Sequence, residues 1–374
     1  MKKYIDQHEM RESNTADVFG VIRKYGRLTR REVKSKTNMS WGAVSAITAR
    51  LIEDGYIVEK KSAPEGIVGR IPSYLEVNDK VHFSIGIDVN NLGFRAVLLN
   101  LKRETVNFWE GETDVSSKDI FIPSLLSFLR KIISESNEIH IFSIGISMQG
   151  IVNSKTGISV TIPGRSDWQD LPLAELVYAE FGIPTFVEHD TACILYATRQ
   201  SNSKKDTMLI RADDGIGMAA MIDGKIIDKP GIFELGHTVA VPDGLLCACG
   251  KRGCLGKYSS QRGLAQRYGK SFEELISDVK SRDENAISLL TEGIGHLAFS
   301  IINAAALLNV DNIVLCGSLW SSTEDFCDKF MDRVKSLCGK ALPSISFTEV
   351  TSAPIGAALI AEKAVLRRID TSKE

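Results

Sequence analysis

The chain has 374 residues, of which 44% are hydrophobic and 25% charged, and its net charge at neutral pH is −2. This length exceeds one typical domain, so two or three domains are expected, with the composition of an ordinary globular protein. No stretch approaches 18 uncharged apolar residues and the first ten residues lack an apolar signal region, which argues against a membrane or exported protein and predicts a cytoplasmic one.

Positive charge is concentrated in the N-terminal part of the chain. Residues 1–80 hold 15 Lys and Arg against 11 Asp and Glu, so this segment carries +4 and the remainder carries −6. A basic head on an acidic body favours a local contact of the head with nucleic acid. A chance fluctuation over 80 residues would produce the same surplus, so the motifs must decide.

Three helical patterns follow one another at short spacing in this head. The first begins near Asn14, the second begins after Thr29, and the third starts at Ser40 and stops at Gly55. Glu32 lies three residues after Thr29, which predicts a capping box. Helices in this order with a tight connection before the third predict a helix-turn-helix.

Two short strands, Tyr56–Val58 and Tyr74–Val77, complete a winged helix-turn-helix. The first turn of the third helix is expected to enter the DNA major groove, while the preceding helix grips phosphates. A small helical bundle that binds only proteins is the alternative, and the wing and the basic charge favour DNA. The candidate phosphate contacts are Arg30 and Arg31, and the candidate groove contacts, which point away from the apolar stripe, are Ser40, Trp41, Gly42, Ser45 and Thr48.

The segment between the two wing strands is rich in Gly and Pro and cannot be regular structure. Arg70 within it is a candidate contact to a narrow, A·T-rich minor groove. A plain linker with a solvated Arg70 is an equal alternative. We assign residues 1–61 to the winged helix and 62–80 to the arm with the second wing strand.

Strands and helices alternate through the rest of the chain, with a hairpin at the start of each half. This pattern predicts an α/β body of two similar lobes with a cleft between them, the first at residues 81–195 and the second at 196–374, whose last helix can return to the first lobe. Strands are expected at 82–89, 94–101, 139–146, 184–188, 208–212 and 312–316, and helices near 119–134, 172–181, 190–200, 283–308, 323–338 and 355–367.

Three of the seven cysteines lie close together in a glycine-rich stretch, at Cys247, Cys249 and Cys254, shortly after His237. Three thiolates and one imidazole form the closed tetrahedral set of a structural zinc site, which leaves no open position for chemistry. A disulfide is disfavoured because no export signal precedes these residues. We therefore predict a structural Zn²⁺ that fixes this loop and orients His237 and Glu234.

These motifs resemble those of the ROK family, which groups sugar kinases and sugar-responsive repressors. The resemblance covers nearly the whole chain, is most specific at the cysteine loop, and includes the head and arm of the repressor branch. It implies a two-lobed actin/hexokinase-like (ribonuclease H-like) α/β body behind the winged helix. The segments that carry it are Glu234–His237 with Cys247–Cys254, Phe186–Asp190 as the Val-Glu-Asn-Asp segment, Asp213–Ala219 as the second phosphate loop, and Ile313–Gly317.

The resemblance also implies a partly retained sugar site. In a kinase of this family Asp190 would be the catalytic base; here it is expected to accept hydrogen bonds from a sugar, although a helix N-cap alone would also favour Asp. The Glu that usually follows the last zinc cysteine is replaced by Gly256. The implied ligand contacts are Asp190, Glu234, His237, His189 and Asp167, and nearby Trp168 would either stack on a sugar ring or pack in the core.

Both phosphate loops depart from the family pattern. The first, Asp-x-Gly-Gly-Thr-Lys in kinases, reads Asp88 to Gly93 here with Asn at both Gly positions, and the second begins with Asp213 and Asp214. Carboxylates beside a triphosphate repel it by a few kcal/mol per unscreened pair, at roughly 4–6 Å and an effective dielectric near 20. We therefore predict no kinase activity, and an active sugar kinase with a regulatory head is the alternative.

The function expected from these observations is a sugar-responsive repressor of carbohydrate-utilisation genes. A dimer or tetramer would bind a palindromic, A·T-rich operator and be released by a carbohydrate effector. Arg165 and Lys257 raise the hypothesis of a sugar phosphate or sugar acid as this effector. A repressor with a vestigial pocket, controlled by a protein partner, is a third alternative.

Overall fold

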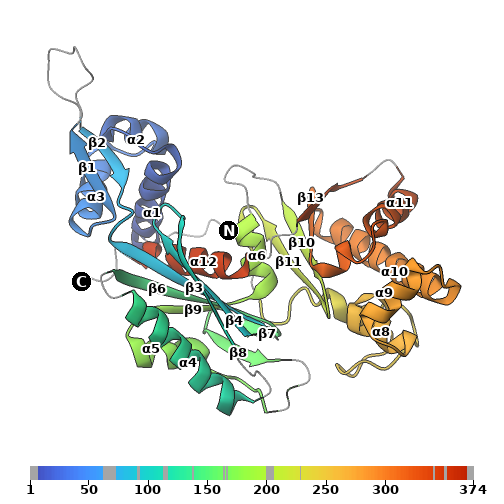
Figure 1. Ribbon diagram of the computed structural model, residues 1–374. Helices are drawn as coiled ribbons and strands as arrows, with labels where there is room; N and C mark the ends of the chain where they lie inside the picture. The colour runs from blue at the N-terminus through green and yellow to red at the C-terminus, as the bar shows by residue number, and fades with distance from the viewer. Residues whose placement is uncertain are drawn as a thin grey trace. The chain divides into compact units, whose positions relative to one another are not determined.

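The computed structural model describes residues 7–61, 73–90, 93–112, 117–136, 139–162, 165, 167–198, 206–227, 229–339, 342–348 and 352–368 (Figure 1). It divides into two compact units. Unit 1 contains Met1–Met148, Pro172–Glu188 and Ala357–Glu374, and unit 2 contains Gln149–Leu171 and His189–Gly356. The expected lobe boundaries are corrected accordingly, because residues 149–171 and 189–195 group with the second unit rather than the first.

The N-terminal elements form the winged helix-turn-helix that the sequence predicts. Thr29 and Glu32 make the capping box, and Asn38 adopts a left-handed conformation with φ 57° in the tight connection. The two wing strands pair in antiparallel fashion, with Ile57 opposite Val77. The elements are α1 (Gln7–Tyr25), which starts earlier than expected, α2 (Arg30–Thr37), α3 (Trp41–Glu53), β1 (Ile57–Lys61) and β2 (Ser73–Val77).

A five-stranded sheet in the order β5-β4-β3-β6-β9 forms the centre of unit 1. β3 pairs antiparallel with β4 and parallel with β6, and Ile85, Ile87 and Ile144 lie in its core without solvent exposure. Figure 1 shows α4 and α5 on one face of the sheet and α12 on the other. The bounds are β3 (His82–Asn90), β4 (Gly93–Asn100), β5 (Thr105–Gly111), α4 (Lys118–Glu135), β6 (His140–Met148), α5 (Leu173–Phe181), β9 (Thr185–His189) and α12 (Ala353–Arg368).

Unit 2 has its own five-stranded sheet, in the order β12-β11-β10-β13-β14. β10 pairs antiparallel with β11 and parallel with β13, so β10 and β13 present their carboxyl ends at the same edge. The strands are β10 (Thr207–Ala212), β11 (Ile216–Ile222), β12 (Lys225–Ile226), β13 (Asn312–Cys316) and β14 (Ser344–Thr348), with the small hairpin β7 (Ile151–Asn153) and β8 (Ile158–Thr161).

Helices pack against this second sheet. Among the described residues, α10 alone is long and apolar enough to cross a membrane, but Leu290, Leu297 and Ile301 are buried in the core of unit 2, as in many core helices. The helical elements are α6 (Asp190–Thr198), η1 (Leu235–His237), α7 (Gly256–Ser259), α8 (Gln261–Tyr268), α9 (Phe272–Lys280), α10 (Glu284–Leu308), η2 (Ser318–Ser321) and α11 (Phe326–Cys338).

Candidate functional site

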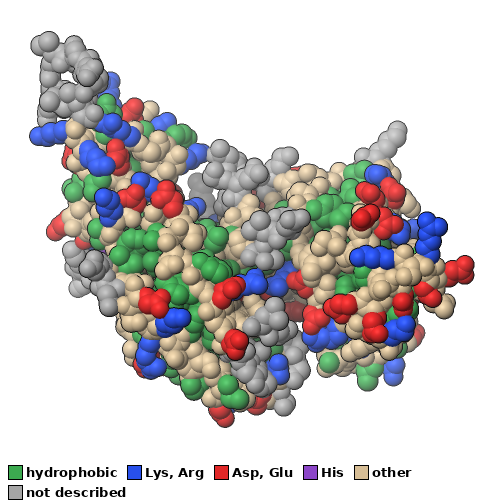
Figure 2. All heavy atoms as spheres, viewed as in Figure 1, with side chains coloured by type: hydrophobic (Ala, Val, Ile, Leu, Met, Phe, Trp, Pro, Cys, Tyr) green, Lys and Arg blue, Asp and Glu red, His purple; other side chains and the backbone are tan. Residues whose placement is uncertain are grey.

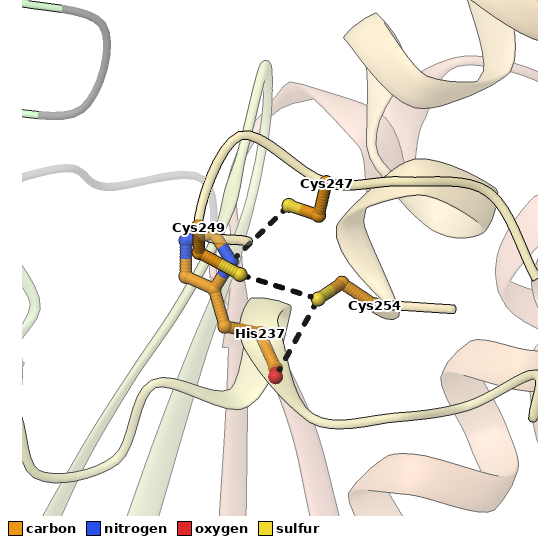
Figure 3. A group of neighbouring side chains, drawn as sticks. All are labelled: His237, Cys247, Cys249 and Cys254. Atoms are coloured by element: carbon orange, nitrogen blue, oxygen red, sulfur yellow. Dashed lines mark hydrogen bonds between the residues drawn. The ribbon is translucent and has the colours of Figure 1, made fainter. Parts of the chain in front are cut away.

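The four predicted zinc ligands come together in unit 2. The ligand atoms of His237, Cys247, Cys249 and Cys254 all lie within 4.8 Å of one another (Figure 3). The Cys249 and Cys254 sulfurs are 3.5 Å apart, as are the Cys247 sulfur and Nδ1 of His237. A tetrahedron with Zn–S bonds of about 2.3 Å has edges of roughly 3.8 Å, so the residues fit a tetrahedral ion.

Glycines shape the loop that carries these cysteines. Gly250 and Gly253 have φ of +84° and +74°, and a Cβ on Gly253 would lie 1.6 Å from the carbonyl oxygen of Val241. The hydroxyl of Tyr258 accepts a hydrogen bond from the backbone N–H of Leu245 at 2.8 Å. The backbone therefore bends tightly enough to bring cysteines spaced over eight residues to one point.

A charged network surrounds Asp190 at the start of α6. Arg211, at the end of β10, donates from Nη1 to Asp190 Oδ2 at 2.9 Å and from Nε to Asp213 Oδ2 at 2.7 Å. The other oxygen of Asp190 accepts the backbone N–H of Thr191 at 2.6 Å. Both Asp190 oxygens are therefore engaged, and the N–H that Oδ1 accepts is that of the next residue rather than the one two or three residues on that an N-cap carboxylate binds.

Both oxygens of Asp213 also accept hydrogen bonds. Its Oδ1 accepts the backbone N–H of Ser318 at 2.6 Å and the Ser318 hydroxyl at 2.7 Å. Burial alone would raise the pKa of Asp213, but the Arg211 charge and hydrogen bond and the two Ser318 donors outweigh it and lower the pKa. An ionised side chain of the protein thus occupies the donors at the carboxyl ends of β10 and β13.

His189 has a defined orientation beside Asp190. The Thr191 hydroxyl donates to the carbonyl oxygen of Met218 at 3.1 Å, so it accepts from Nδ1 of His189 at 2.6 Å. This arrangement places the proton of a neutral imidazole on Nδ1. His189 is half-buried, so its ring can present Nε2 as an acceptor to a polar ligand.

The start of β11 connects this network to the cysteine loop. A Cβ on Gly217 would lie 2.9 Å from the Thr191 side chain, and one on Gly236 would lie 2.6 Å from the carbonyl oxygen of Ile216. Adjacent residues of β11 therefore contact α6 on one side and η1 on the other. Glu234 is half-buried next to η1.

The other residues expected to bind a sugar differ in burial and in their hydrogen-bond partners. Trp168 is completely buried and its Nε1 donates to the Ser159 hydroxyl at 3.0 Å, so of the two alternatives core packing is correct. Asp167 is exposed, and Lys257 binds the side chain of Gln266 at 2.5 Å. Gly164 and its neighbours at 163 and 166 lie outside the described residues.

Asp88 of the first phosphate loop is buried in unit 1 and satisfied by its neighbours. The Ser147 hydroxyl donates to Asp88 Oδ1 at 2.7 Å, and the Asn90 amide donates to Oδ2 at 3.1 Å. Asn90, at a position where the family pattern has Gly, thus binds the carboxylate that precedes it. Residues 91–92 lie outside the described residues.

The winged helix exposes part of the predicted DNA-contacting set. Trp41 is 53% exposed at the first turn of α3. Figure 2 shows Lys and Arg side chains on the visible surface of the head. Ser40 is the N-cap of α3, accepting the Ala43 N–H at 3.2 Å, which satisfies a backbone donor and positions this turn. Arg31 and Gly42 are exposed and Ser45 is half-buried, whereas Arg70 lies outside the described residues.

Two members of that set have structural partners instead. The expectation that Thr48 points outward is wrong, because its side chain is fully buried and its hydroxyl accepts from Nε of Arg30 at 3.1 Å. Arg30 also makes a two-pronged ion pair with Glu59 of β1, at 2.5 and 2.9 Å. Arg30 therefore links α2 to α3 and to the wing. The apolar pattern of α3 did not predict the burial of Thr48, because threonine is a polar residue.

Sequence reasoning missed two residues of the Asp190 network, Arg211 and Ser318. An arginine at the end of an otherwise apolar strand, two residues before the acidic pair, was a usable signal for Arg211. Nothing local marked Ser318, because its role depends on β13 lying parallel to β10. Its partner is 105 residues away in the chain.

Comparison with known proteins gives two matches to family profiles. The ROK family profile matches residues 84–363, and a winged helix-turn-helix DNA-binding profile matches residues 17–58. The two matches follow one another along the chain without overlap. Together they reproduce the division between a DNA-binding head and an α/β body.

Individual relatives and solved structures match either most of this chain or its α/β body. A putative xylose repressor of Caldicellulosiruptor sp. (strain Rt8B.4) is 24% identical over 335 residues, covering 82% of this chain and 83% of the relative. The crystal structure of a ROK family transcriptional regulator, a homologue of the Escherichia coli Mlc protein, matches 96% of this chain and 98% of its own with TM-score 0.82 at 20% identity. A ROK hexokinase from Thermus thermophilus matches 76% of this chain and 99% of its own, with TM-score 0.67 at 19% identity.

Proposed function

Because this chain belongs to the ROK family and carries a winged helix-turn-helix, we propose that it is a transcriptional repressor whose body senses a carbohydrate without phosphorylating it. It would act in the cytoplasm on carbohydrate-utilisation genes. The observation that carries the proposal is the network in which Arg211 and Ser318 hold Asp190 and Asp213 at the carboxyl edge of unit 2.

This network supports binding without phosphotransfer. A general base must receive the proton of the attacking hydroxyl, but both oxygens of Asp190 already accept hydrogen bonds, one from Arg211 and one from Thr191. The Ser318 N–H and hydroxyl face the carboxylate of Asp213, so neither donor points to a phosphate. Asp213 and the exposed Asp214 add negative charge where a triphosphate would need positive charge.

Asp190 retains a role in ligand binding under this proposal. A carboxylate offers four acceptor positions; the bonds to Arg211 and Thr191 use two of them, and Nδ1 of His189 lies 3.3 Å from Oδ1. Hydroxyl groups of a carbohydrate would donate to the remaining positions, with His189 beside Asp190. The engagement of Lys257 with Gln266 gives less support to an anionic effector than the sequence did.

His237, Cys247, Cys249 and Cys254 would hold a structural Zn²⁺. The ion would supply no reaction chemistry, since four protein donors complete its tetrahedron. The loop would instead be fixed in the bend that its glycines permit, which keeps η1 against β11. Glu234 would thereby be held next to the effector site.

DNA would be bound by the exposed first turn of α3, with Trp41 and Gly42 at the major groove and Arg31 at a phosphate. Ser45 and Arg70 remain candidate contacts on the same grounds as in the sequence. Two heads of a dimer or tetramer would read a palindromic, A·T-rich operator.

A thermal-shift screen of neutral sugars, sugar acids and sugar phosphates, followed by gel shifts with each hit, tests the sensor proposal. We expect at least one compound to stabilise the protein and to weaken its binding to an operator selected from random duplexes. A protein that selects no duplex would refute the repressor, and one that binds DNA but no compound would favour control by a protein partner.

An active kinase is the second candidate, because Asp190 and the hexokinase-like fold are retained. ATP turnover with a hexose panel, measured by a coupled assay, separates the two proposals. We expect no turnover above that of Asp190→Asn. Turnover that this substitution abolishes would establish the kinase instead.

A further inference from the structure

Glu362, in the middle of α12, is a carboxylate with only 1% of its surface exposed. A buried charge is costly unless it is paired and hydrogen-bonded. Nη1 of Arg23, in α1 of the winged helix, lies 2.5 Å from Glu362, and Nη2 of Arg103, between β4 and β5, lies 3.6 Å away. One buried carboxylate on α12 thus binds both the DNA-binding head and the sheet of unit 1.

The apolar residues around this ion pair form one continuous core. Val18, Phe19 and Ile22 of α1 pack in the same cluster as Leu366, one turn beyond Glu362. Phe142 of β6 belongs to this cluster as well. The head therefore does not have a core of its own, and α1 is held against α12 by apolar packing and by the ion pair together.

A second, independent contact holds the C-terminal end of α3 against unit 1. Nε2 of His82, at the start of β3, lies 2.7 Å from the carbonyl oxygen of Asp54, the C-cap of α3. The carbonyl can only accept, so His82 donates there and accepts from Nδ1 of His140 at 2.9 Å. Tyr56 stacks on the His82 ring at 4.3 Å.

Two glycines make close backbone approaches around the start of α12. A Cβ on Gly356 would lie 1.8 Å from the carbonyl oxygen of Cys193 in α6. A Cβ on Gly145 of β6 would lie 2.0 Å from the carbonyl oxygen of Ala357. Each approach requires glycine, so α12 begins against the helix that starts with Asp190.

We infer that α12 positions the winged helix, with Glu362 as the positioning residue that makes α1 follow any displacement of α12. The inference concerns the regulation of the proposed repressor and so rests on that function. Separating Arg23 from Glu362 would leave a buried carboxylate underpaired, so the two helices move together.

Hydrogen–deuterium exchange of the full-length, zinc-loaded chain tests this inference without DNA or effector. In Glu362→Gln we expect amide exchange of residues 15–25 and 353–366 to rise at least tenfold, with α10 unchanged. The matched control is Glu180→Gln, which removes the exposed ion pair with Arg130 in the same unit. An unchanged α1, or an equal rise in the control, would overturn the inference.

A double-mutant cycle distinguishes a specific pair from a general loss of packing. Arg23→Gln should raise exchange in α1 as Glu362→Gln does, and the double variant should add little to either single change. Strictly additive effects would contradict the coupling. If Glu362→Gln does not fold, Arg23→Gln alone carries the exchange test, because Arg23 is not inside α12. If the wild-type protein selects no DNA duplex, the proposed repressor is refuted, but the conclusion from the exchange experiment is unaffected.

Discussion

Asp190 shows how one unexpected neighbour changes what a retained residue can do. It is the first residue of α6, and its Oδ1 accepts the N–H of the next residue, Thr191. Arg211 then supplies a permanent positive charge at 2.9 Å, which no motif of the family pattern predicts. The identity of Asp190 therefore does not show which partners its carboxylate has, and Arg211 of β10 is one of them.

Replacing Arg211 by Met should destabilise the protein by about 2 kcal/mol, because two largely buried carboxylates would lose their common counter-ion. The control is Arg262→Met, since Arg262 pairs with Asp214 where both side chains are more than half exposed. This exposed pair should contribute less than about 1 kcal/mol. Urea denaturation at pH 7.5 measures both, and equal midpoints for the two variants would contradict the network's role.

His82 should make stability depend on pH. Burial first, and then the neighbouring His140, lower the pKa of His82, although its hydrogen bond to Asp54 acts in the opposite direction. Below pH of about 6.5 the unfolded chain binds a proton that native His82 does not, so stability falls as the pH decreases from that point, by up to about 1.4 kcal/mol per unit. Above this range the contribution is fully present.

The measurement is denaturation of the zinc-saturated protein between pH 7.5 and 5.5, in the wild type and in His82→Phe. Phe keeps the stacking on Tyr56 but cannot take a proton, so its stability should vary less over this interval. Titration of other groups affects both proteins and cancels in the comparison. Parallel pH profiles would show that His82 does not carry the effect.

Two adjacent arginines should differ in their effect on DNA binding. Arg31 is exposed, and Arg31→Ala should weaken binding to all duplexes and reduce the salt slope of the affinity by about one. Arg30→Ala should mainly destabilise the head, because Arg30 is bonded to Glu59 and Thr48. Anisotropy titrations over a salt series check the first expectation and thermal unfolding the second; a salt slope lowered by Arg30→Ala alone would reverse the assignment.

At the scale of elements, the predicted strands and helices with strong apolar periodicity are present within a few residues of their expected bounds. Elements without that periodicity were missed, including β5, β11 and helices α8 and α9. β11 consists of small and flexible residues, and its pairing with β10 gives it strand structure. For α9 a signal existed, because Ser271 and Glu274 form a capping box.

The candidate site was predictable where its residues are close in sequence. Spacing alone identified His237, Cys247, Cys249 and Cys254, and the structure brings their ligand atoms together. Contacts that depend on sheet order, such as Ser318 with Asp213, were not predictable, because strand neighbours are set by the whole topology. Burial of Thr48 was missed for a similar reason, since its partner Arg30 lies in another helix.

The cysteine loop should depend on its metal. We expect one Zn²⁺ per chain by elemental analysis, and Cys249→Ser should remove it and destabilise the protein by ~3 kcal/mol or more. Cys338→Ser is the matched control, since Cys338 lies in α11 outside the cluster. Metal-free protein with an unchanged melting midpoint, or a disulfide among the three loop cysteines in mass spectrometry, would disprove the site.

At the scale of the molecule, the head and the body carry opposite net charges. The head carries +4 over residues 1–80, whereas the rest carries −6, so attraction to DNA is confined to the winged helix. The body must then influence DNA binding through structure rather than through its own charge. α12 contributes Leu366 to the core that α1 shares with the sheet of unit 1.

This arrangement makes the response to a carbohydrate reciprocal. If a compound from the thermal-shift screen weakens operator binding by some factor, saturating operator must weaken binding of that compound by the same factor, because both act on one conformational equilibrium. We expect a factor of about 5 to 150, the usual range of such coupling. Isothermal titration of the compound into free and operator-bound protein gives two affinities, and operator titrations with and without the compound give the other two. These four affinities define the thermodynamic cycle. Equal affinity of the compound for free and DNA-bound protein would mean that it cannot release the repressor, however tightly it binds.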